Sequence, residues 1–417
     1  MALTTQKIPH HLLSLFGTGA GPSSLQKAWD GNANYQRHAL KPHDRVPEEL
    51  RDWAHAEQYL GNEKYYPDFL VFFQREMERH GWEHVVNEHL FKRDAKAEDL
   101  LVRLFGGFLH PLIQLMYGLE WKQPAIVAEA LAQTCVHKND LREFLMVSEQ
   151  NAAASSSAAM PPILSLYEAV RNDPKLAAAA HDGDANKVRD GVLVRAKDEI
   201  IKVASRVRVR PEELDARTAE MFNAAVLVAA SAAVHPPKYP KFDFFLMHHV
   251  NSAPIFLTVN AAPWIAAADK ARILEWKIRM DLLQYAARAA PPASLDRIAS
   301  YTPRDDDDHG RTVAPPHARP VQSSGERLAG IAARLHDLED DGHAIKLARA
   351  TAICRQLTEG GEGGRFENDE RLRIKGEEMW DRLLRLIVDS VTAPGAKWVR
   401  TTGLETAWKD VPDQPKL

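Results

Sequence analysis

The segment MFNAAVLVAASAAV, at residues 221–234, is the richest apolar stretch of the chain and is interrupted only by Asn223 and Ser231. It is shorter than the ~18 uninterrupted apolar residues that a transmembrane helix needs. A helix that is apolar on every side lies inside a protein, where other elements cover it. The segment therefore predicts a helix buried in the core of a folded domain.

Helical periodicity continues on both sides of this segment. Residues 326–338 carry apolar side chains at 328, 331, 332, 335 and 338, which share one face of a helix. Similar patterns predict helices over residues 10–16, 67–78, 100–108, 112–117, 124–136 and 380–391. Nowhere do two runs of alternating apolar and polar residues, the pattern typical of strands, flank a hairpin turn. We therefore expect an all-α fold, a large bundle-like single domain over residues 1–417 with few or no strands.

Two segments lack this periodicity. Residues 150–162 are rich in small residues and helix breakers, and residues 301–325 combine prolines with an acidic run. Both compositions are typical of linkers and loops. We expect 301–325 to form a flexible internal loop, with an active-site lid as the alternative because long loops in compact domains are often functional.

The composition is that of an ordinary globular protein. Of the 417 residues, 45% are hydrophobic and 26% are charged, and the formal net charge is −4. This balance offers no positive surface for nucleic acid or an anionic membrane, so neither is expected as a partner. Cys135 and Cys354 form no CxxC motif, which excludes a disulfide framework and a zinc ribbon. The start has no signal-peptide pattern, so we expect a cytoplasmic protein.

Three short motifs resemble functional signatures but lack the structural context that each needs. GTGAG at residues 17–21 follows a predicted helix instead of a strand, so it is not a dinucleotide loop, and we expect no flavin. HGWEH at residues 80–84 resembles an inverted zinc-protease motif, but Gly81 should end a helix between its two histidines. His336 and Asp337 lack the partners that a phosphohydrolase would need.

Histidines in apolar helical surroundings form the remaining chemical signal. They are His10 and His11, His110, His248 and His249, and His343. Each buried imidazole needs hydrogen-bond partners, and a shared metal would satisfy several at once. Imidazole nitrogens suit iron, zinc or copper. Ordinary core histidines without a metal remain the alternative at this point.

Strings around these histidines resemble the questin-oxidase-like family of fungal polyketide pathways. The matching strings are PHHLL at 9–13, YYPDFL at 65–70, FLHPLI at 108–113, DFFLMHH at 243–249, DDGH at 340–343 and WVRTTGLETAW at 398–408. They occur in order over nearly the whole chain. The resemblance implies oxidative cleavage of the carbon–carbon bond beside a quinone carbonyl of an anthraquinone, giving a benzophenone-type product. Members have been described as Baeyer–Villiger oxidases, and close relatives as dioxygenases.

The resemblance also implies a site built on non-haem Fe²⁺, with dioxygen and a small aromatic polyketide as substrates. Carried over to this chain, the metal ligands would be His10, His110, His248, His343 and Lys375. Lys375 would be the catalytic residue, carboxylated by carbon dioxide so that it supplies an anionic oxygen. The fourth histidine could instead be His11, His137 or His249, because Gln114 stands where relatives tend to have a second histidine.

Five aromatic side chains are candidates for holding a flat ring: Phe105, Phe108, Phe244, Phe245 and Trp380. Three classes of function therefore follow from the sequence. The first is an iron-dependent oxygenase acting on an anthraquinone, the second a histidine-rich metallohydrolase or phosphohydrolase, and the third a metal-free helical binding protein. The sequence does not give the oligomeric state.

Overall fold

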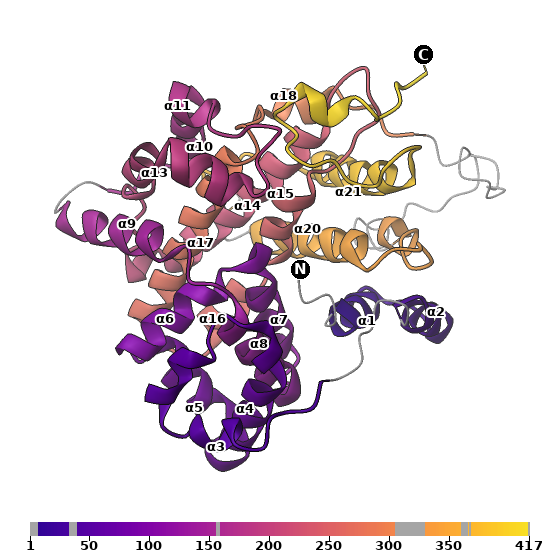
Figure 1. The fold of residues 1–417 in the computed structure, drawn as a ribbon. Coiled ribbons are helices and arrows are strands. Elements are labelled where there is room, and N and C mark those ends of the chain that lie inside the picture. The colour runs from indigo at the N-terminus through magenta and orange to yellow at the C-terminus, as the bar shows by residue number, and fades with distance from the viewer. Residues whose placement is uncertain are drawn as a thin grey trace.

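A computed structural model of the chain describes residues 7–32, 40–155, 159–304, 330–359, 366 and 368–415. Helices make up most of this part of the chain (Figure 1), which contains no strand and only two isolated β-bridges, Lys238 with Asp413 and Asp243 with Val399. Most buried apolar side chains, from Leu15 to Val391, belong to one core. The prediction of an all-α fold is confirmed.

The long helix α14 (Leu214–Ala233) lies at the centre of the C-terminal half, and every residue from 217 to 233 is buried. This confirms the core helix that the apolar segment predicts. Its neighbours include α15 (Phe244–Asn251), α17 (Ala267–Ala286) and α20 (His343–Glu359). A fourth neighbour, α21 (Glu377–Thr392), packs beside α20.

The other α-helices are α1 (Lys7–Gly17), α2 (Pro22–Asn32), α3 (Val46–Glu49), α4 (Tyr66–His80), α5 (Trp82–Val86), α6 (Ala95–Leu104), α7 (His110–Glu120), α8 (Pro124–Val136), α9 (Arg142–Ala154), α10 (Ile163–Asn172), α11 (Pro174–Ala177), α12 (Leu193–Arg195), α13 (Lys197–Ala204), α16 (Ile255–Ala261) and α18 (Leu295–Ala299). Short 3₁₀ turns occur at Trp53–Gln58, Glu63–Tyr65, Gly107–Leu109, Pro211–Glu213 and Glu405–Trp408, and π-helical turns at Asn87–Phe91 and Lys187–Val192.

Several predicted boundaries can be compared with these helices. Helix α8 has the predicted bounds, and Gly81, with φ +80°, separates α4 from α5 inside the HGWEH motif as expected. The helix predicted over 100–108 instead ends at Leu104. Of the helix predicted over 326–338, the described part is helical at 330–333 and then turns.

The predicted loop at 301–325 lies mostly outside the described residues. Its first residue, Tyr301, is buried, and its hydroxyl donates a hydrogen bond to the Asp389 carboxylate of α21. The backbone N–H of Arg304 donates to the same carboxylate at 2.9 Å. The start of the segment is therefore anchored to the core, which corrects the predicted boundary.

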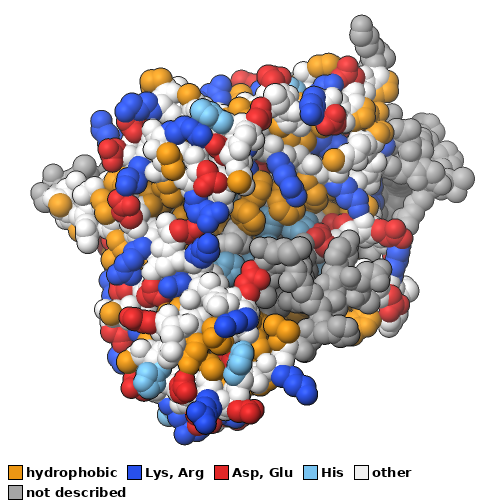
Figure 2. Space-filling model, viewed as in Figure 1, with side chains coloured by type: hydrophobic (Ala, Val, Ile, Leu, Met, Phe, Trp, Pro, Cys, Tyr) orange, Lys and Arg blue, Asp and Glu red, His pale blue; other side chains and the backbone are white. Residues whose placement is uncertain are grey.

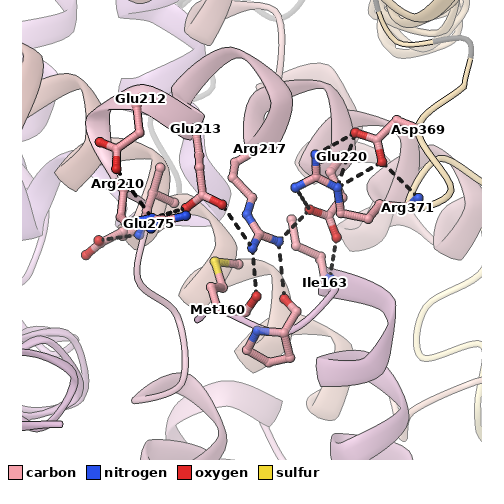
Figure 3. Close-up of polar contacts among 12 residues, drawn as sticks. Met160, Ile163, Arg210, Glu212, Glu213, Arg217, Glu220, Glu275, Asp369 and Arg371 are labelled. Atoms are coloured by element: carbon pink, nitrogen blue, oxygen red, sulfur yellow. Dashed lines mark hydrogen bonds and ion pairs between the residues drawn. The ribbon is translucent and has the colours of Figure 1, made fainter. Parts of the chain in front are cut away.

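A buried network of ion pairs ties α14 to two distant segments (Figure 3). The Arg217 guanidinium donates to Glu220 at 2.8 Å and to the Met160 carbonyl at 2.7 Å. Glu220 also accepts the backbone N–H of Ile163 at 2.6 Å, and Arg371 lies 3.8 Å from it. Burial raises the pKa of Glu220, so these donors keep its charge tolerable in the core.

Among the described residues, no single helix is both long enough and apolar enough to cross a membrane. Only the pair Ala95–Leu104 and Gly107–Glu120 passes that test jointly, and the pair is bent by 70°.

Replacing Arg217 with Met should destabilise the protein by about 3–5 kcal/mol, because Glu220 would stay buried without its hydrogen-bonded cation. The matched control is Arg210→Met, since Arg210 pairs with Glu213 while 58% exposed, and its loss should cost at most about 1 kcal/mol. Urea denaturation followed by circular dichroism measures both effects. Equal midpoints for the two variants would contradict a structural role for the network.

Candidate functional site

Three histidines from three separate helices converge on one point. His110 begins α7, His248 lies in α15, and His343 begins α20. The Nε2 atom of His248 lies 3.1 Å from that of His110 and 3.3 Å from that of His343. Each residue offers one ligand atom, and these atoms lie within 4.8 Å of one another.

The other ring nitrogens determine what this cluster can bind. His248 Nδ1 lies 2.6 Å from the Phe244 carbonyl, which can only accept, so this nitrogen carries the proton. His343 Nδ1 contacts the Asp341 carboxylate, which fixes the same tautomer. The Nε2 lone pairs of both rings therefore point toward each other. A cation between them removes this repulsion.

A transition metal fits these three donors. Metal–nitrogen bonds of about 2.0–2.1 Å place neighbouring imidazole nitrogens at about the separations seen here. Metal-bound histidines usually donate their second N–H to a backbone carbonyl or a carboxylate, as His248 and His343 do. The site therefore has the donor set and the orientation of a three-histidine metal centre.

A strained turn aims His110 at the cluster. Gly107, Phe108 and Leu109 all have positive φ, at +54°, +60° and +64°. A Cβ atom on Gly107 would overlap the ring of His137, so only glycine fits there. This turn ends the preceding helix early and explains why the predicted helix over 100–108 stops at Leu104.

Capping carboxylates position the other two histidines. Asp243 accepts the backbone N–H groups of Phe245 at 2.8 Å and Leu246 at 3.1 Å, so it begins α15 one turn before His248. Asp340 accepts the backbone N–H groups of Gly342 at 2.8 Å and Ala344 at 2.9 Å, at the start of α20.

Aromatic rings form a wall beside the cluster. The Phe244 ring lies 4.8 Å from that of His248 and 5.3 Å from that of His343. The centroid of the Phe108 ring lies 4.8 Å from that of Phe245 and 6.4 Å from that of His110. We call Phe108, Phe244 and Phe245 the aromatic wall. Phe108 is 38% exposed and the other two are half-buried, so the wall is accessible from outside.

The two other candidate aromatic residues do not belong to this wall. Phe105 is buried against Trp276, and Trp380 is buried on α21. Both are ordinary core residues.

The space-filling view shows histidine and hydrophobic side chains exposed together near the middle of one face (Figure 2).

The remaining candidate histidines lie outside the cluster. His10 stacks on Tyr117 of α7, with ring centroids 4.8 Å apart. His11 contacts Asn32, and its ring packs against Gly342. His137 donates to the Gln133 carbonyl behind the strained turn. His249 pairs with Asp281 at 2.5 Å on the α17 side.

The structure does not bring Lys375 to the histidines, which corrects the predicted ligand set. Gly376, the residue after Lys375, donates its backbone N–H to the side chain of Glu359. Glu359 is the last residue of α20, whereas His343 is the first residue of that helix. At about 1.5 Å per residue these two ends lie roughly 24 Å apart. Asn223 of α14 holds the neighbouring Ile374 backbone, and Lys375 itself is exposed.

Sequence reasoning missed the buried lysine beside the cluster. Lys346 follows His343 by three residues, so both side chains share one face of α20. It is 5% exposed, and its charge contributes to lowering the pKa of His11, after the larger effect of burial. The i, i+3 spacing from a helical histidine was the signal that could have found it.

Comparison with known proteins identifies the chain's relatives. Residues 5–351 match the family model described as Questin oxidase-like. The chain is 37% identical to the questin oxidase of Aspergillus fumigatus, over 97% of this chain and 88% of that protein. It is 35% identical to the oxidoreductase AflY of Aspergillus parasiticus, over 98% of this chain and 84% of that protein. It is 34% identical to the Baeyer-Villiger oxidase ptaJ of Pestalotiopsis fici, over 97% of this chain and 86% of that protein. The chain therefore belongs to the questin oxidase-like family of oxidoreductases.

Proposed function

We propose that the protein is a non-haem iron oxygenase that opens a ring of an anthraquinone in fungal polyketide biosynthesis. The observation that carries this proposal is the convergence of the His110, His248 and His343 Nε2 atoms, with the tautomers of His248 and His343 leaving the lone pairs of these two rings facing each other. The relative from Aspergillus fumigatus is named for the oxidation of questin, which supports an aromatic polyketide as the substrate.

The residues of the site have distinct parts in this proposal. His110, His248 and His343 would hold the iron, and bound iron would supply the one-electron chemistry that lets dioxygen react with a closed-shell aromatic ring. Asp341 holds the proton on His343 Nδ1 and so keeps Nε2 available as a donor. The aromatic wall would stack on the flat ring, since offset stacking favours such contacts.

Phe244 has a second part, because its ring covers the imidazoles of His248 and His343. Trp398 adds a further contact to His343, with ring centroids 6.2 Å apart. A hydrophobic shell of this kind limits the access of water to a metal site.

We further propose that Lys346 has the part that the family resemblance assigned to Lys375. An ammonium on α20 one turn after His343 would be repelled by a divalent cation held at the three histidines. Carboxylation by carbon dioxide would turn Lys346 into an anionic oxygen donor on a flexible stem.

The two alternative functions have less support. Compared relatives are named as oxidases, which does not favour a metallohydrolase. A metal-free binding protein would leave the lone pairs of His248 and His343 opposed at 3.3 Å.

The first test is the metal content of protein purified without chelators. We expect about one iron per chain, and His110→Ala, His248→Ala and His343→Ala should each lower this by roughly 10-fold or more. The matched control is His89→Phe, since His89 is also buried but lies among Trp53, Phe72 and Phe73. Full dioxygen uptake with a hydroxyanthraquinone by metal-free protein would refute the proposed iron site.

The second test compares the two lysines. Lys346→Arg should lower turnover about 100-fold or more, because a guanidinium cannot become an anionic oxygen donor. Lys375→Arg should leave turnover and iron content nearly unchanged, since Lys375 is exposed at the far end of α20. Bicarbonate added to carbon dioxide-depleted protein should restore the activity of the wild type and not of Lys346→Arg. If Lys375→Arg loses turnover and Lys346→Arg keeps it, Lys375 and not Lys346 is the carboxylated ligand.

A further inference from the structure

Arg288 is a buried arginine whose guanidinium has no polar partner among the described residues. It lies two residues beyond the end of α17 and is 3% exposed. Its Nε atom is buried without a hydrogen bond, and no ion pair joins its side chain to any described carboxylate. The guanidinium carbon lies 4.2 Å from the centre of the Phe245 ring, which belongs to the aromatic wall.

The nearby carboxylate of Asp243 is already fully used. One oxygen accepts the N–H groups of Phe245 and Leu246, and the other accepts those of Thr401 at 2.7 Å and Thr402 at 3.0 Å. The negative charge of Asp243 therefore acts to raise the pKa of Arg288, against the effect of burial, without a direct hydrogen bond between the two side chains. Burial lowers the pKa of Arg288 to about 10, so the side chain stays charged at neutral pH.

The backbone around Arg288 keeps the side chain in this place. Ala289 and Ala290, which follow it, have positive φ of +57° and +41°. Gly403 donates its N–H to the Arg288 carbonyl at 3.0 Å, and a Cβ on Gly403 would overlap the Ala289 carbonyl. The backbone at Arg288 is therefore fixed beside the wall, where the guanidinium packs on the Phe245 ring.

Arg288 lies within reach of a ligand bound at the histidines. Phe245, which it covers, precedes His248 by one helical turn and contacts Phe108. A flat aromatic molecule that stacks on the wall would bring its edge to the guanidinium. An isolated buried cation is costly, and an anionic oxygen on that edge would remove the cost.

We propose that Arg288 binds an anionic oxygen of the aromatic substrate, a phenolate or a carboxylate, and thereby selects ionised over neutral ligands. The inference rests on the proposed function, in that it assumes an aromatic ligand on the wall. It assigns Arg288 to substrate binding and leaves the identity of the metal open.

The test measures ligand binding to metal-free protein, so that turnover is not the readout. Quenching of tryptophan fluorescence gives Kd for two pairs of probes: an anthraquinone carboxylate with its methyl ester, and a hydroxyanthraquinone above its phenol pKa with its O-methyl ether. Wild-type protein should prefer the anionic member of at least one pair by roughly 10–100-fold, as hydrogen bonds to a charged group predict. The preferred pair shows whether the oxygen is a carboxylate or a phenolate.

Arg288→Gln should remove this preference while binding of the neutral probe changes little, and Arg288→Lys should retain part of it. The control Arg79→Gln removes a charge from the exposed end of α4 and should behave as wild type. If the wild type binds charged and neutral probes equally, or Arg288→Gln keeps the preference, the role of Arg288 is wrong. If no probe binds at all, the proposed function fails with it.

Discussion

The buried carboxylate of Asp243 is the constraint on which the site depends. Its two oxygens accept four backbone N–H groups, two at the start of α15 and two in the turn at 401–402. The first pair places Phe244 and Phe245 on the wall and His248 one turn later. The second pair holds the C-terminal segment beside Arg288, whose carbonyl accepts the N–H of Gly403. One fully used acceptor thus aligns one histidine of the cluster, two aromatic rings and a cation that the carboxylate does not itself bind.

The helices and the identity of the clustered histidines could be predicted, but the directions in which the histidine side chains point could not. Apolar patterns predicted α8, and a continuous apolar stretch predicted the core of α14, because such patterns report which residues are buried. The family resemblance pointed to His110, His248 and His343, and the structure brings these three together. Adjacent histidines on a helix point about 100° apart. For that reason His249 faces Asp281 and Lys277 on α17, away from the site of His248.

The position of Lys375 shows what the family resemblance could not supply, namely where the fold places this residue. The apolar pattern over residues 380–391 indicated a helix with a buried face but not which end of that helix would lie near the histidines. The chain leaves α20 at Glu359 and starts α21 beside that same end, so α21 runs back toward His343. Trp398, which follows α21, contacts His343, whereas Lys375, which precedes it, lies at the opposite end. Only the antiparallel pairing of the two helices decides this.

Four of the seven non-glycine residues that have positive φ in the described part of the chain lie at the two places that the proposed substrate would touch. Phe108 and Leu109 have left-handed conformations immediately before His110, and Ala289 and Ala290 have positive φ immediately after Arg288. Residues in such conformations cost of order 1–3 kcal/mol each and persist only when the surroundings hold them. Glycines make this possible, since Gly107 admits His137 and Gly403 admits the Ala289 carbonyl. The packing that holds these turns therefore fixes the backbone at His110 and Arg288 before any ligand arrives, and such preorganisation lowers the cost of binding a rigid, flat molecule.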